Sequence, residues 1–256
     1  MKKKPDFFDV RGTIKSYPDA QYYIFFGERS NGKTYSSLDL CLEYYHKTHH
    51  QFAYIRRWGE DIKKKNLSEL FAGHIANGRV EKWTDCEYNH IDYGSNRFFL
   101  SNIDESGEKV QSTEPIGFAF DLNSMEHTKS ISFPKVDLII FDEFLSRNGY
   151  LPNEWILFTN TLSTIIRHRS NVKIIMLGNT VNKYCPYFQE MGLTHVKDQK
   201  PGTVEVYRYA GTDLQVVCEY TPSSAKKGGK ESDVYFAFDN PQLKMITGGD
   251  WEIAIY

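Results

Sequence analysis

The residues from Gly27 to Thr34 have the pattern G-x-x-x-x-G-K-T, whose chemistry is phosphate binding. Gly27 and Gly32 can take positive φ without a Cβ clash, so the loop curls and turns its backbone N–H groups inward. Lys33 would reach the β- and γ-phosphates of a nucleoside triphosphate, and the Thr34 hydroxyl would bind Mg²⁺. The candidate nucleotide-binding residues are Gly27, Glu28, Arg29, Ser30, Asn31, Gly32, Lys33 and Thr34. A chance match is the alternative, which an apolar run before the loop and a helical pattern after it disfavour.

A second pair of reactive residues, Asp142 and Glu143, follows the nearly continuous apolar run 136–141. In phosphate-loop enzymes a buried strand beside the loop strand delivers an acid to the metal, so Asp142 is predicted to contact Mg²⁺ through water. Glu143 points elsewhere because side chains alternate along a strand, and it is placed to polarise an attacking water as a general base. A small-molecule kinase would not need this second acid. The pair therefore predicts hydrolysis, and an acidic strand end without a catalytic role is the alternative.

The apolar run 172–177 is followed by Asn179, which we predict to lie beside the nucleotide as a polar and catalytic contact. Asn182 and Lys183 resemble a guanine-reading motif, but the acid that this motif requires is missing. We therefore exclude a GTPase and predict that the bound nucleotide is ATP, with Mg²⁺ as its metal.

These side chains need strands whose carboxyl ends meet at one edge of a sheet. The apolar run 22–26 enters the loop as a buried strand would, and residues 35–45 leave it with helical spacing. The other expected elements are a strand at 52–55, a helix over 60–76, a helix that opens at 152–154, and paired strands at 204–209 and 214–220. The loop strand and the Asp142 strand are about a hundred residues apart, which suits the additional-strand, catalytic-glutamate (ASCE) division of phosphate-loop NTPases.

The predicted fold class is therefore α/β, a P-loop NTPase of the ASCE division with a doubly wound, mainly parallel sheet. Short β-like runs at 80–83, 97–100 and 116–122, separated by turn residues, predict an antiparallel β insertion over 79–125. We expect residues 1–200 to form the ATPase domain and residues 201–256 to form a small, β-rich linker or lid.

Composition limits the classes of partner. Lys plus Arg total 31 against 33 acids, and the net charge of −2 argues against coating nucleic acid by charge alone but permits a local basic strip. The four cysteines are scattered, with no metal-ligand spacing, so we expect them to be reduced and the protein to be intracellular. The N-terminus lacks the apolar run of a signal peptide, and no stretch is long enough to span a bilayer.

The chain resembles the DNA-packaging (encapsidation) ATPases of small short-tailed bacteriophages with protein-primed genomes, which are terminase-like motors. The resemblance covers about residues 20–190. Its motifs are the G-x-R-x-x-G-K-T loop, Tyr54-Ile55-Arg56-Arg57, Ile140-Phe141-Asp142-Glu143-Phe144, Tyr150-Leu151-Pro152-Asn153-Glu154, Arg167-x-Arg169, Asn179, and the run from Asn182 to Phe188. The Arg-Arg, Pro-Asn-Glu and Pro-Tyr-Phe runs together make it specific.

The resemblance implies a homo-oligomeric ring, typically a pentamer, at the portal (connector) of an empty procapsid in the host cytoplasm. Such a ring pumps double-stranded DNA inward using ATP and is not part of the mature virion. The resemblance also implies that a nuclease-like C-terminal domain, missing here, would follow these residues.

At the residue level the resemblance implies functional roles for Arg29, Lys129 and Arg167. We expect Lys129 and Arg167 to contact nucleotide across a subunit boundary, whereas the alternative for each is a surface ion pair of little energetic value. Arg56 is a candidate for holding Glu143 in an inactive rotamer, a role that Arg57 would serve as well.

Two other functions stay open on the sequence. One is a different ring or helicase-like ATPase that remodels nucleic acid or protein. The other is a nucleotide switch that does not hydrolyse ATP, against which Glu143 argues because a pure switch needs no positioned base.

Overall fold

The computed structural model describes residues 7–123, 132–180 and 184–222. The chain divides into two compact units. We call residues 1–33, 143–150 and 176–256 the loop unit, because it contains the phosphate loop, and residues 34–142 and 151–175 the aspartate unit, because it contains Asp142. The chain passes between the two units at the Lys33–Thr34 and Asp142–Glu143 peptide bonds, among others.

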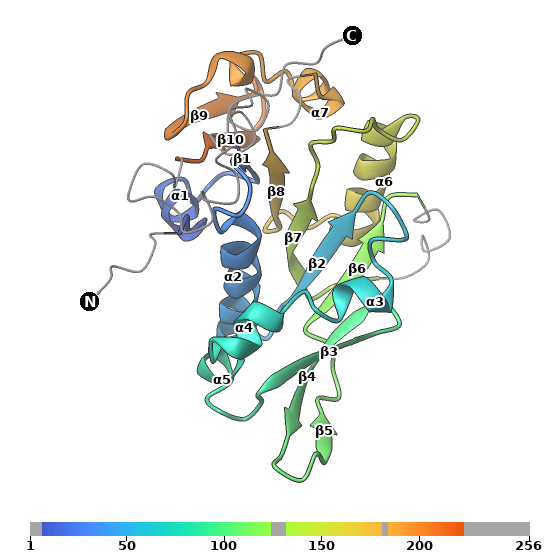
Figure 1. Ribbon diagram of the computed structural model, residues 1–256. Coiled ribbons are helices and arrows are strands. Elements are labelled where there is room, and N and C mark those ends of the chain that lie inside the picture. The colour runs from blue at the N-terminus through green and yellow to red at the C-terminus, as the bar shows by residue number, and fades with distance from the viewer. Residues whose placement is uncertain (1–6, 124–131, 181–183, 223–256) are drawn as a thin grey trace, which may run out of the picture. The chain divides into compact units, whose positions relative to one another are not determined.

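The aspartate unit is built on strands in the order β3-β4-β6-β2-β7, with β5 paired to β4 (Figure 1). The strand bounds are β2 Gln51–Arg56, β3 His90–Gly94, β4 Arg97–Ile103, β5 Lys109–Gln111, β6 Gly117–Asp121 and β7 Val136–Asp142. β2 runs parallel to both β6 and β7, whereas β4 is antiparallel to β3, β5 and β6. Every residue of β7 is buried, as expected for a parallel strand covered on both faces.

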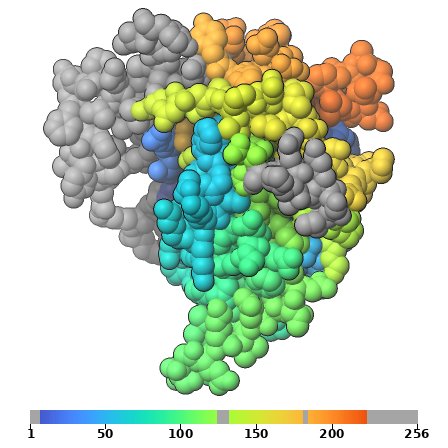
Figure 2. Space-filling model, turned by 90° about the vertical axis from the view of Figure 1, so that its right-hand side faces the viewer, coloured from blue at the N-terminus to red at the C-terminus, as the bar shows by residue number. Residues whose placement is uncertain are grey.

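The helices of this unit are α2 Lys33–Thr48, α3 Lys64–Leu67, α4 Ala72–Ala76, α5 Arg79–Trp83 and α6 Glu154–Ile166. In Figure 1, α2 and α6 flank β2 and β7 on opposite sides. α6 begins as predicted, after Asn153 in a left-handed conformation, and Glu154 accepts a hydrogen bond from Leu151 N at 2.7 Å. The hairpin between β4 and β5 projects from the rest of the unit (Figures 1 and 2).

The described part of the loop unit contains α1 Arg11–Ser16, β1 Tyr22–Gly27, the second half of β8 Lys173–Asn179, α7 Pro186–Glu190, the 3₁₀ helix η2 Val196–Asp198, β9 Thr203–Arg208 and β10 Gln215–Tyr220. Its strand order is β8-β1-β10-β9. β1 pairs in parallel with β10, and β10 pairs antiparallel with β9, as the predicted strand pair requires.

The α/β class with parallel core strands is confirmed, but four details of the prediction are corrected. Residues 79–83 form helix α5, which starts after Gly78 at φ 61°, and not a strand. The expected helix over 60–76 is two short helices, α3 and α4. Residues 117–121 form a core strand parallel to β2, so the antiparallel insertion is confined to β3–β5.

The fourth correction concerns the expected boundary at residue 200. Because β10 pairs directly with β1, residues 203–220 belong to the same sheet as the strand that enters the phosphate loop. They are therefore not a separate lid. Residues 223–256, the rest of the expected linker, lie outside the described residues.

Candidate nucleotide-binding site

The phosphate loop lies directly after β1 in the loop unit. Gly32 has φ 104°, in the region that only glycine adopts without strain, and Ser30 takes a left-handed φ of 58°. An added Cβ on Gly32 would lie 3.1 Å from Phe8 O, a tight contact that adds to the conformational reason for glycine there. The curled backbone that the sequence motif predicts is therefore present.

Lys33 is folded back onto this loop and is only 5% exposed. Its Nζ donates to Glu28 O at 2.7 Å and to Asn31 Oδ1 at 3.1 Å. Both acceptors belong to the loop. Phosphate oxygens of a ligand in the loop could replace these two acceptors of the ammonium group. Arg29, by contrast, is exposed.

Asp142 ends β7 and is the centre of a polar cluster in the aspartate unit. The Thr34 hydroxyl lies 3.3 Å from each Asp142 carboxylate oxygen, and Tyr54 OH donates to Oδ2 at 2.9 Å. Burial and the nearby Asp142 charge raise the pKa of Tyr54 well above its ordinary value, so this hydroxyl stays protonated and keeps donating. Hydroxyl and carboxylate oxygens are the hard ligands that Mg²⁺ prefers, so Thr34 and Asp142 fit the predicted metal.

Arg56 extends from the end of β2 into the same cluster. Its Nη1 lies 4.0 Å from Asp142 Oδ2, and its Nη2 donates to Asp61 Oδ2 at 3.3 Å. Within the aspartate unit, Arg56 is therefore associated with Asp142. Its predicted action on Glu143 stays a prediction.

Glu143 is exposed and takes a left-handed φ of 59°, a conformation that costs a non-glycine residue about 1–2 kcal/mol. The next residue, Phe144, is fully buried and donates its N–H to Leu177 O at 3.1 Å. The chain thus turns sharply immediately after Asp142.

Asn179 ends β8 and is half-buried. Its neighbour Thr180 donates its N–H to Gly27 O at 3.1 Å, which fixes this strand end against the first glycine of the loop within the loop unit. Asn179 therefore directly precedes a residue that binds the phosphate loop. Thr180, which the sequence did not single out, makes that contact.

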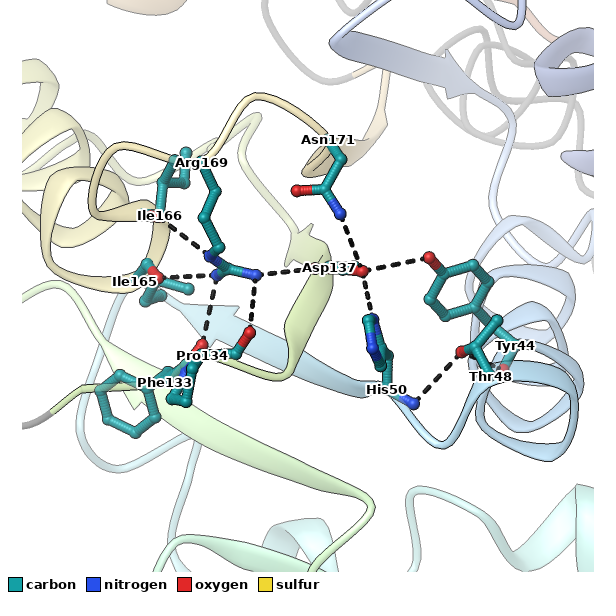
Figure 3. A network of polar contacts seen from close by, with 10 residues as sticks. All are labelled: Tyr44, Thr48, His50, Phe133, Pro134, Asp137, Ile165, Ile166, Arg169 and Asn171. Atoms are coloured by element: carbon teal, nitrogen blue, oxygen red, sulfur yellow. Dashed lines mark hydrogen bonds and ion pairs between the residues drawn. The ribbon is translucent and has the colours of Figure 1, made fainter.

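Arg167 and Arg169 have different surroundings although they share one motif. Arg167 is exposed at the C-cap of α6, with φ 39°. Arg169 donates from Nη1 to Asp137 Oδ1 at 2.7 Å and also to the carbonyl oxygens of Phe133, Pro134, Ile165 and Ile166 (Figure 3). Lys129, the other predicted trans-acting residue, lies outside the described residues.

Asp137 anchors this second cluster near the start of β7, at the opposite end of the strand from Asp142. It also accepts from Asn171 Nδ2 at 3.1 Å and Tyr44 OH at 3.3 Å, and contacts His50 Nδ1 (Figure 3). Since β-strands rise about 3.3 Å per residue, Asp137 is roughly 17 Å from Asp142 along β7.

Two of the sequence runs that carry the resemblance meet in the aspartate unit. Arg57 Nε donates to Glu154 Oε2 at 2.7 Å, and both side chains are buried. The Arg-Arg and Pro-Asn-Glu runs are therefore joined by an ion pair that fixes the end of β2 to the start of α6.

Sequence reasoning missed three contributors to the site: Tyr54 on Asp142, Thr180 on Gly27, and Thr221 on Asn31. Each partner is remote in the chain, and the only available signal was a polar residue in or after an otherwise apolar strand. Among the described residues, no group of three or more His, Cys, Asp or Glu side chains is arranged to hold a metal, and no helix is long and apolar enough to cross a bilayer.

The fold is that of a phosphate-loop NTPase domain of the ASCE division, a mixed α/β fold with a mainly parallel sheet. The chain matches the family described as Podovirus DNA encapsidation protein (Gp16) over residues 13–207, and it belongs to that family. It is 29% identical over 170 residues to the DNA packaging protein of Bacillus phage B103, covering 65% of this chain and 46% of the relative. This chain thus spans about half the length of the curated relatives it matches.

Solved structures support the same fold. The N-terminal domain of the DNA packaging ATPase from bacteriophage phi29 superposes with a TM-score of 0.64 at 24% identity, covering 87% of this chain and 99% of that domain. The bacteriophage phi29 viral genome packaging motor assembly gives a TM-score of 0.65 at 22% identity, over 98% of this chain and 69% of the matched one.

Proposed function

We propose that this chain is the ATP-hydrolysing part of a motor that moves double-stranded viral DNA into a preformed procapsid. Membership of the encapsidation family gives the biological context. The observation that carries the chemical part is the Thr34–Asp142 pair, in which the last residue of the phosphate-loop motif lies 3.3 Å from the strand-end acid. This pairing is what a Mg²⁺-dependent nucleotide site requires.

In the proposed reaction, the loop N–H groups and Lys33 bind the triphosphate, and Lys33 exchanges Glu28 O and Asn31 Oδ1 for phosphate oxygens. Thr34 and Asp142 would hold Mg²⁺, whose charge offsets that of the phosphates. Glu143 accepts a proton from the attacking water, and Asn179 supplies a polar contact.

Arg167 is proposed to complete the site of a neighbouring subunit in a homo-oligomeric ring, with the pentamer expected from the resemblance. Arg169, two residues further along the chain, contacts Asp137 near the start of β7 and away from Asp142, and this supports action of Arg167 in trans. Lys129 is the second candidate. Double-stranded DNA and the procapsid portal are the proposed partners, and the host cytoplasm is the proposed location during packaging.

The first test substitutes Glu143, which should affect hydrolysis. A substitution of Lys33, which should affect nucleotide binding instead, is the comparison. In the full-length protein, Glu143→Gln should bind ATP with Mg²⁺ but hydrolyse it about a hundredfold more slowly or worse, because no base takes the proton from water. Lys33→Ala should instead lose nucleotide binding, measured with a fluorescent ATP analogue. Near-normal turnover by Glu143→Gln would rule out its role as the base, and ATPase activity indifferent to portal, procapsid and DNA would favour a different remodelling ATPase.

A further inference from the structure

Thr221, the residue directly after β10, packs against the phosphate loop although it is far from the loop in the chain. It is 1% exposed. Its backbone N–H and its hydroxyl both donate to Phe26 O, at 2.8 and 3.2 Å. Phe26 immediately precedes the loop, so these two bonds fix Thr221 against the point where β1 becomes the loop.

The first glycine of the phosphate-binding motif is required by this contact. A Cβ placed on Gly27 would lie 2.1 Å from Thr221 Oγ1, far inside any allowed separation. The glycine thus admits the threonine hydroxyl as well as giving the loop its conformational freedom.

The hydroxyl of Thr221 also decides the orientation of Asn31. A threonine hydroxyl has one hydrogen, and here it is directed to Phe26 O, so towards Asn31 the oxygen acts as an acceptor. Asn31 Nδ2 therefore donates to Thr221 Oγ1, at 2.7 Å, with both side chains buried. The amide nitrogen is fixed on this side, and the amide oxygen must face the other way.

The amide oxygen of Asn31 faces Lys33. Oδ1 accepts from Lys33 Nζ at 3.1 Å and lies 3.4 Å from Lys33 N. If the amide rotated by half a turn, it would present its NH₂ group to the ammonium, where neither can accept. The chain of contacts thus runs from Phe26 O through Thr221 and Asn31 to the lysine.

We propose that Thr221 is a positioning residue for Lys33, acting through Asn31 to hold the lysine ammonium in its folded-back place while the loop carries no nucleotide. This rests on the proposed function only in that the loop is taken to bind a nucleoside triphosphate. The consequence is that the residue directly after β10 contributes to the phosphate site, although it lies outside the motif.

The test measures the accessibility of Lys33 in nucleotide-free, full-length protein. The probe is acetylation by an N-hydroxysuccinimide ester, with the rate at each lysine read by mass spectrometry and exposed Lys47 as the internal reference. Thr221→Val keeps the size of the side chain and removes the hydroxyl. Lys33 labelling should rise about fivefold or more relative to Lys47, the change expected when one net hydrogen bond is lost.

Thr221→Ser is the matched control, since it keeps the hydroxyl and should label at the wild-type rate. Asn31→Leu tests the link from the other end, and the double variant should label no faster than Asn31→Leu alone, because Thr221 acts only through Asn31. Equal Lys33 labelling in wild type and a folded Thr221→Val would overturn the proposal. So would equal increases in the Val and Ser variants, which would make side-chain size the cause.

The same assay separates this inference from the proposed function. ATP with Mg²⁺ should protect Lys33 in the wild type if the loop binds nucleotide. Absence of protection would contradict the proposed function while leaving the dependence of Lys33 on the Thr221 hydroxyl intact.

Discussion

At the scale of single residues, the two acids of the site have contrasting environments. Asp142 is buried and approached by the hydroxyls of Thr34 and Tyr54 and by Arg56, whereas Glu143, the next residue, is exposed after a left-handed turn. A buried, fully hydrogen-bonded carboxylate suits a fixed metal ligand, and an exposed one suits a group that must meet water. Their environments therefore agree with the two proposed roles.

Tyr54 gives the sharpest residue-scale prediction. Tyr54→Phe keeps the buried ring but removes the donor that orients Asp142, so the Mg²⁺ concentration needed for half-maximal ATPase activity should rise about 10–100-fold. Tyr44→Phe is the matched control, because Tyr44 also donates to an aspartate of β7, but to Asp137 near the other end. A Mg²⁺ titration in which both variants shift alike, or neither shifts, would contradict the assignment.

At the scale of elements, one buried and one partly buried ion pair at element ends hold the aspartate unit together. Arg57 joins the end of β2 to the start of α6 through Glu154, and Arg169 joins the segment after α6 to the start of β7 through Asp137. The two ends of α6 are thus held by Arg57 of the Arg-Arg run and by Arg169 of the Arg-x-Arg run. Arg167, at the C-cap of α6, is exposed, and its role in a neighbouring subunit stays a prediction.

Removing Arg57 should therefore be a stability defect. Arg57→Leu leaves Glu154 buried without its charged partner, so the free energy of unfolding should fall by about 3–5 kcal/mol in urea denaturation. Replacing both residues by leucine should recover much of this loss, because no buried charge remains. Lys63→Ala, which breaks an exposed pair with Glu60, should leave the free energy of unfolding nearly unchanged, and a similar loss for all three variants would refute the argument.

At the scale of the whole molecule, the buried tyrosines set an alkaline limit to stability. Burial raises the pKa of Tyr22, Tyr23 and Tyr93 to about 12 from the ordinary value of 10.0. A raised folded-state pKa means that the contribution to stability is fully present below the unfolded pKa and is lost as the pH rises through the folded one.

Unfolding should therefore begin between pH 10.0 and about 12 and coincide with the appearance of phenolate absorbance. Tyr22→Phe should match the wild type at about pH 8 but resist unfolding better at about pH 11.5, because that side chain can no longer ionise. Phenolate absorbance that appears fully before any loss of circular dichroism would show that the rings titrate in the folded protein, contrary to this expectation.

Assembly is the other property of the whole molecule. If Arg167 stabilises the γ-phosphate charge of a neighbour, Arg167→Ala should spare ATP binding and lower ring-stimulated turnover by roughly 10³-fold or more. Mixing Arg167→Ala with Glu143→Gln subunits should restore some hydrolysis, since each supplies what the other lacks, while Arg97→Ala, at another exposed arginine, should behave as wild type. Mixtures that never exceed the sum of the separate variants, with a concentration-dependent wild type, would shift the trans role to Lys129.

The sequence by itself determined the phosphate loop, the Asp142–Glu143 pair and the strands that carry them. These features are local: a cradle needs glycines and a lysine at fixed spacing, and buried parallel strands need continuous apolar runs. The helix start at Glu154 was readable for the same reason, because an N-terminal helix signal lies within a few residues.

Only the tertiary structure decided which remote residues complete the site. Asn31 and Thr221 are 190 positions apart, and Tyr54 and Asp142 are 88 apart, so no local pattern could pair them. The same holds for β6 and β10, whose short apolar runs fit either a hairpin or a parallel core strand until their neighbours are known. Strand order is chosen by which faces bury together, and that choice is made by the folded chain as a whole.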